Sequence, residues 1–100
     1  AAIPPFAHLA LLETSHAQPE FARAALATAA DALRSWGADV RGPVAASVAK
    51  VRDIWRFHLL VKSADRRALH GWLARLALEV APQLPGAAGL TVDVDPAGFS

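Results

Sequence analysis

Residues 55–62 read Trp-Arg-Phe-His-Leu-Leu-Val-Lys, and two kinds of side chain alternate along them. The odd-numbered residues are all apolar, and two of the four are aromatic: Trp55, Phe57, Leu59 and Val61. The even-numbered residues are mostly polar: Arg56, His58, Leu60 and Lys62. Because successive side chains of a strand point to opposite faces of its sheet, this stretch predicts a strand with one buried face and one face toward solvent.

The segments on either side extend this prediction. Val40–Val51 is rich in β-branched residues and is interrupted by Gly42-Pro43, which predicts a strand with a bent, edge-like beginning. Residues 52–54 (Arg-Asp-Ile) are expected to turn the chain into a hairpin. Beyond the hairpin, Ser63 or Asp65 is placed to cap a helix. The expected apolar stripe of that helix is Leu69, Trp72, Leu73, Leu76 and Val80.

The first third of the chain predicts a strand and a helix. Ala7–Glu13 would carry apolar side chains on both faces of a strand, as in a central strand, and residues 15–18 form a polar break. Pro19 suits the first turn of a helix, and Gly37 its C-terminal cap. The expected buried face of this helix repeats at spacings of three and four: Phe21, Ala25, Ala29, Ala32, Leu33 and Trp36.

The chain ends on one more predicted strand, in which Leu90, Val92 and Val94 alternate with polar residues after a turn-rich connector. The resulting order is β-α-β-β-α-β. The economical packing of that order is an α+β, two-layer sandwich with two helices on one face of a four-stranded antiparallel or mixed sheet. A length of 100 residues fits a single domain, 1–100.

Composition limits the class of protein. The chain has no Cys, which excludes disulfides and thiolate metal sites and favours a reducing, cytoplasmic setting. It also has no Met, so we interpret it as a fragment excised from a larger protein. Hydrophobic residues make up 54% of it, which suggests surface that meets another part of that protein. No stretch is long and apolar enough to predict a membrane span.

The charges are unevenly distributed. Net charge is only +1, but the segment from Arg41 to Arg75 carries +6 and the remainder −5. A basic middle is a candidate footprint for phosphates or for an acidic peptide. The residues assigned to phosphate contact lie on the polar face of the strand over residues 55–62 and across the hairpin from it: Lys50, Arg52, Arg56 and Lys62. An ordinary solvated face explains these residues equally well.

A second basic cluster comprises Arg66, Arg67 and His70, at the start of the second helix. Arg66 and His70 are four residues apart and share a helix face. An arginine beside a helix N-terminus suits a carboxylate, such as that of an acidic tail. The simpler interpretation is that Arg66 or Arg67 pairs with Asp65 or is solvated. For Trp55, stacking on a base is less favoured than a place in the core.

Patterns of catalysis are missing from the sequence. It has no phosphate-binding glycine loop, no Gly-x-Ser-x-Gly elbow and no metal-ligand spacing among its four histidines. Asp93 and Asp95 share a strand parity that could hold a cation, but a solvated strand end explains them better. An acylphosphatase-like enzyme is set aside because the chain has no Asn and no Arg before Arg23. We therefore expect no catalytic site, metal or cofactor in this fragment.

Five motifs in order resemble a known family, the C-terminal domain of PriA, the primosomal replication-restart helicase of bacteria. They are Pro4-Pro5-Phe6 with residues 9–12, Gly42-Pro43-Val44, residues 55–62, Asp65-Arg66 with Leu69, and Asp93-Val94-Asp95-Pro96. Ala46 and Lys50 replace a proline and an arginine of the family pattern.

The resemblance implies a fold similar to ribosomal protein S10 and binding to branched or single-stranded DNA at stalled forks. It also implies docking onto the other helicase domains and contact with the acidic tail of single-stranded-DNA-binding protein. Arg66 matches the family arginine associated with that tail, and His70 replaces a common Gln. The parent that it resembles is an ATP-dependent 3′–5′ helicase that binds zinc, with both functions outside this chain.

Three functions remain open from the sequence. The leading one is a non-catalytic DNA-binding and docking domain of a replication-restart helicase. The alternative is a protein-interaction module that binds the acidic tail of single-stranded-DNA-binding protein and packs on the helicase core. The third is a free S10-like RNA-binding domain, which the resemblance to a helicase domain disfavours.

Overall fold

The computed structural model describes residues 8–84 and 89–94, without the side chains of residues 47–51. Its principal elements are β1 (His8–His16), α1 (Pro19–Ser35), β2 (Asp39–Val51), β3 (Ile54–Ser63), α2 (Arg66–Arg75) and β4 (Gly89–Val94). Helix α2 continues into a π-helical turn, Leu76–Val80, and a short 3-10 turn, Ala81–Gln83. The predicted α+β fold with a β-α-β-β-α-β order is confirmed.

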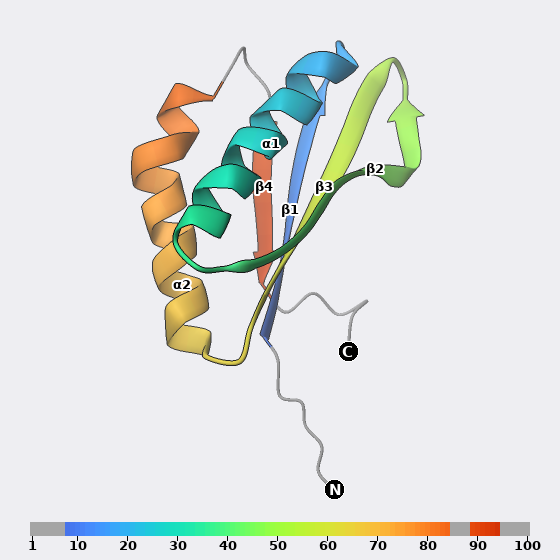
Figure 1. Cartoon of the computed structure of the whole chain (residues 1–100). Coiled ribbons are helices and arrows are strands. Elements are labelled where there is room, and N and C mark those ends of the chain that lie inside the picture. Colours follow the sequence, from blue (N-terminus) through green and yellow to red (C-terminus); the bar gives the residue numbers. More distant parts are fainter. Residues whose placement is uncertain (1–7, 85–88, 95–100) are drawn as a thin grey trace, which may run out of the picture.

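The strands form one antiparallel sheet in the order β2-β3-β1-β4, and both helices lie on the same side of it (Figure 1). Strands β1 and β2 run in the same direction because each is antiparallel to β3, which lies between them. This is a split β-α-β arrangement, in which α1 crosses over the sheet to join its two parallel strands. The opposite face of the sheet is covered by no element of the chain that the structure describes.

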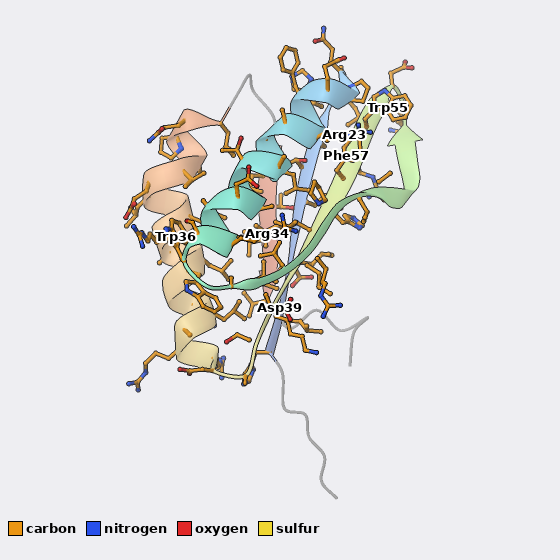
Figure 2. All side chains as sticks on the ribbon, viewed as in Figure 1. Arg23, Arg34, Trp36, Asp39, Trp55 and Phe57 are labelled. Atoms are coloured by element: carbon orange, nitrogen blue, oxygen red, sulfur yellow. The ribbon has the colours of Figure 1, made fainter. Side chains whose placement is uncertain are left out.

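The core lies between the helices and one face of the sheet. Strand β3 contributes Phe57, Leu59 and Val61, which are buried, as the alternation of residues 55–62 predicts. Trp55, at the beginning of the same row (Figure 2), packs against this core and is partly buried. The second helical stripe is also confirmed, because Leu69 and Leu76 are fully buried and its other members pack around them.

The predicted buried face of the first helix is wrong at its N-terminal end. Phe21 is 37% exposed and meets the His16 ring edge-on, with 5.1 Å between ring centroids. Ala25, Ala29 and Leu33 of the predicted face are buried, and Ala22, Leu26 and Ala30 are buried beside them. The helix is thus rotated toward its alanine-rich row, whose small side chains let the helix axis approach the sheet closely.

The predicted end of the first strand is also wrong, because β1 runs to His16, into the first half of the expected polar break. Thr14 faces the core there and is buried. Its hydroxyl donates a 2.7 Å hydrogen bond to the carbonyl of Ala22 in α1. That bond satisfies the polar group inside the apolar layer, so a threonine can continue the strand.

The hairpin and the bent start of the second strand are both confirmed. Arg52 and Asp53 form a two-residue turn with φ of 52° and 65°, and Val51 pairs with Ile54 across it. The ladder between β2 and β3 shifts between Arg41 and Val44, where Gly42 has φ of 110°. The cross-strand pairs Arg41–Leu60 and Val44–His58 therefore flank a bulge at Gly42-Pro43, as expected for such residues in an edge strand.

Two sequence motifs, Pro4-Pro5-Phe6 and the end of Asp93–Pro96, lie wholly or partly outside the described residues. Among the helices of the described part, none is long and apolar enough to cross a membrane.

Candidate nucleic-acid interface

The face of the sheet away from the helices, hereafter the open face, carries the residues whose parity is opposite to the core. Cross-strand pairs share a face, so the register defines its members. On the central strands they are Leu9, Leu11, Glu13 and Ser15 of β1, and Arg56, His58, Leu60 and Lys62 of β3. On the outer strands they are Asp39, Arg41 and Val44 of β2, and Thr91 and Asp93 of β4.

An acidic residue lies at the centre of this face. His58 Nε2 donates a hydrogen bond to Glu13 Oε1 over 2.8 Å, and Arg56 Nη1 lies 3.7 Å from the same oxygen. The side chains of Arg56 and Glu13 are only 34% and 29% exposed. Their mutual attraction is therefore less screened than at a fully exposed site, and the carboxylate compensates much of the Arg56 charge. Arg56 is on the predicted face, but its charge faces the carboxylate of Glu13 and is not free of an acidic partner.

The other three residues of the predicted strand-face set lie at different places in the fold. The backbone of Lys50 pairs with Trp55 of the core-facing row, and the Lys50 side chain lies outside what the structure describes. Arg52 occupies the hairpin turn and is exposed, next to Asp53. Lys62 is on the open face, but it is six positions along β3 from Arg56, which is about 20 Å of strand. The predicted set is therefore divided between the two ends of β3.

Lys62 instead lies at the end of β3 from which the chain leads into the second predicted cluster. Strand β3 ends at Ser63, and α2 begins at Arg66 after a tight connection in which the Ser63 hydroxyl bonds to the backbone of Asp65. Asp65 caps α2, as predicted, by accepting a 2.9 Å hydrogen bond from the backbone N–H of Arg67. We call this part of the surface the basic end, and define its cations as Arg41, Lys62, Arg66 and Arg67.

The basic end carries a net positive charge. Its acidic members among the described residues are Asp39, 3.2 Å from Arg41, and Asp65, which is used as the helix cap. Lys62, Arg66 and Arg67 are exposed, and no ion pair joins them to any residue that the structure describes. The predicted pairing of Arg66 or Arg67 with Asp65 as an ion pair is thus not formed. His70 is exposed one turn along α2 from Arg66.

A hollow of about 260 Å³ opens on the same face, next to the basic end. Its floor is apolar, and the lining residues are Leu11, Arg41, Gly42, Val44, His58 and Leu60. The bulge of β2 forms one wall, because Gly42 approaches β3 so closely that a Cβ there would lie 3.0 Å from the His58 carbonyl oxygen. The glycine therefore allows the two strands to meet around the hollow.

Sequence reasoning missed Arg41 and Glu13 as members of this surface. Arg41 lies in the predicted second strand, and Gly42 after it signals irregular backbone, but no pattern shows which side chains the bulge brings together. Glu13 meets His58 across 45 residues of sequence, which only strand order and register determine. Around Asp93, as elsewhere in the described ranges 8–84 and 89–94, no group of His, Cys, Asp and Glu is arranged to hold a metal ion.

Comparison with known proteins identifies a family. The sequence model described as "Primosomal protein N C-terminal domain" matches residues 1–97 of the chain. No curated protein matches the sequence. Among solved structures, the de novo designed protein Foldit4 superposes with a TM-score of 0.69 at 11% identity, covering 90% of this chain and 97% of the design. At that identity the similarity concerns the fold alone.

Proposed function

The chain belongs to the family of primosomal protein N C-terminal domains, and from that premise we propose that it is a DNA-binding domain whose phosphate contacts lie at the basic end. A domain of a primosomal replication-restart protein has DNA and replication proteins as its expected partners. The observation that supports the proposal is the set of exposed cations, Lys62, Arg66 and Arg67, that have no acidic partner among the described residues.

Two features of the basic end suit phosphate. Arginine and lysine side chains at an exposed edge lose little hydration on meeting a phosphate and release counterions from the DNA. The two arginines stand in the first turn of α2, where the helix dipole adds a partial positive charge. The hairpin end offers less, since Arg56 is compensated by Glu13 and Arg52 has Asp53 beside it. We therefore assign Lys62, Arg66 and Arg67 the main part, and Arg52, Arg56 and Lys50 a lesser one.

Fluorescence anisotropy with forked, duplex and single-stranded DNA at several salt concentrations tests this assignment. The combined K62A/R66A/R67A variant is expected to weaken binding more than tenfold at low salt. It is also expected to reduce the slope of log affinity against log salt by about 2, since each lost phosphate contact removes roughly 0.7–0.9. Arg52→Ala is the matched control at the other end of β3, with an expected loss of about twofold or less. Unmeasurable binding by the unaltered domain at low salt would refute the DNA role.

The second candidate function is recognition of the acidic tail of single-stranded-DNA-binding protein, and the same surface supports it. Arg66, Arg67 and His70 lie exposed within the first five residues of α2, where a carboxylate would meet two guanidinium groups and the N-terminal end of the helix dipole. If both ligands use this corner, they compete. Docking on other domains of the parent protein is a further proposed role, favoured by the uncovered open face.

Titration with a peptide of the acidic tail separates these functions. Arg66→Ala is expected to lower peptide affinity at least fivefold, and the peptide is expected to displace DNA from the unaltered domain. Arg75→Ala is the matched control, because Arg75 is on the same helix but stacks on Trp36 at 4.4 Å and pairs with Glu79. Unchanged peptide affinity in Arg66→Ala would exclude this site for the tail while leaving the DNA proposal intact.

A further inference from the structure

We propose that the hollow on the open face holds one unstacked base of single-stranded DNA, with the adjoining phosphates on the basic end. This inference rests on the proposed DNA-binding function and names its preferred form of DNA. The hollow's three aliphatic side chains, Leu11, Val44 and Leu60, are the core of the site. They remain partly or mostly exposed in the described structure, with Val44 at 58%, so they offer apolar area that a ligand would cover.

The size of the hollow suits a base. Its volume of about 260 Å³ lies just below the roughly 300–1,000 Å³ that pockets for drug-sized ligands occupy. It therefore accommodates one flat ring system and not a whole nucleotide, whose sugar and phosphate would stay outside. The face of a base is apolar, and contact with aliphatic or aromatic side chains is tolerant of sequence because every base has such a face.

Polar groups at the rim match what surrounds a base. Arg41 lines the hollow, and its pairing with Asp39 at 3.2 Å holds the guanidinium at the edge of β2. A planar guanidinium stacks on bases as well as binding phosphate. On the other side His58 is held by its hydrogen bond to Glu13, which leaves the ring fixed beside the apolar floor. A base between these two groups would meet preorganised partners.

Charge favours a nucleic acid over an apolar peptide side chain in this hollow. Arg41 belongs both to the lining and to the basic end, and Lys62 follows Leu60 by two positions on the same face of β3. A strand whose base enters the hollow thus has cations beside it for its phosphates. An uncharged peptide side chain would contact the apolar floor of the hollow but would not bind these cations. In double-stranded DNA the bases are stacked and paired, so the hollow selects for single strands.

The test compares two labelled 12-mers of equal charge in fluorescence anisotropy with the whole chain: oligothymidylate and an abasic strand of the same length. We expect oligothymidylate to bind about tenfold more tightly, in line with roughly 1–3 kcal/mol per stacked base. Leu60→Ala is expected to remove most of that difference without changing affinity for the abasic strand. Leu78→Ala, a matched substitution at a leucine that is 78% exposed on the helical layer, is expected to change neither.

Each outcome assigns a result to one proposal. Equal affinity for the two 12-mers would overturn the base site and leave phosphate binding at the basic end in place. Two results together would support both proposals. The unaltered domain binds oligothymidylate more tightly than the abasic strand, and the K62A/R66A/R67A variant binds neither strand. If neither strand binds the unaltered domain, the DNA role and the base site are both refuted. Where oligothymidylate binds, methyl NMR shifts at Val44, Leu11 and Leu60 are expected on its addition, and their absence would overturn the base site alone. Displacement of oligothymidylate by an apolar, uncharged peptide with the same methyl shifts would also count against a base as occupant.

Discussion

Leu59 and Leu60 are neighbours of identical chemistry on one strand, yet they serve opposite faces of the sheet. Leu59 is completely buried beneath the helices, whereas Leu60 lies half-buried on the open face and lines its hollow. The same contrast runs through the sheet. One face is a continuous apolar layer, and the other mixes a few leucines with charged residues. The covered face determines stability, and we expect the open face to determine what the domain binds.

The largest expected effect separates the two leucines directly. Leu59→Ala is expected to lower the free energy of unfolding by about 2–5 kcal/mol, because it leaves a cavity in a core that cannot collapse around it. Leu60→Ala is expected to cost about 1 kcal/mol, because solvent already reaches this side chain. Urea denaturation followed by tryptophan fluorescence measures both. A similar loss in the two variants would mean that the open face is covered in solution, for instance by a second copy of the chain.

A smaller effect on stability is expected at the bulge of β2, which forms one wall of the hollow. Gly42→Ala places a Cβ 3.0 Å from a backbone oxygen of β3, at a residue whose φ of 110° suits glycine. The expected loss of stability is about 1–3 kcal/mol, together with weaker binding of oligothymidylate because the wall of the hollow moves. Gly71→Ala is the control, since an added Cβ there meets no atom within 4 Å. Its expected effect is a small stabilisation of α2.

The smallest expected effect concerns the charge at the centre of the open face. Glu13→Gln keeps a hydrogen-bonding oxygen for His58 but removes the negative charge beside Arg56. Affinity for any DNA is expected to rise about twofold to threefold at low salt, with a slightly steeper salt dependence. Asp31→Asn, which removes a charge from an exposed position of α1, controls for the change in net charge. Equal increases in the two variants would show that the effect is one of overall charge and not of Arg56.

Much of this architecture follows from local patterns. The alternation in residues 55–62 predicts both faces of β3, and the helical stripe from Leu69 to Val80 predicts how α2 packs. Ser63 and Asp65 are the two cap candidates by type and position, and the structure shows that Asp65 caps α2. The rotation of α1 was not predictable in the same way. Phe21 fits the apolar spacing, but the close approach that alanines allow outweighs the gain from burying one aromatic ring.

The sequence by itself therefore determined the order of elements, the two faces of the third strand and the family to which the domain belongs. Tertiary structure alone decided which charges meet. It divided the predicted phosphate ligands between the two ends of β3, placed Arg41 and Lys62 on the open face, and placed Glu13 against Arg56. The physical reason is range. Periodicity shows on which face of its own helix or strand a residue lies. Ion pairs and hollows depend on strand order, register and a bulge, which bring together residues that are distant in the chain.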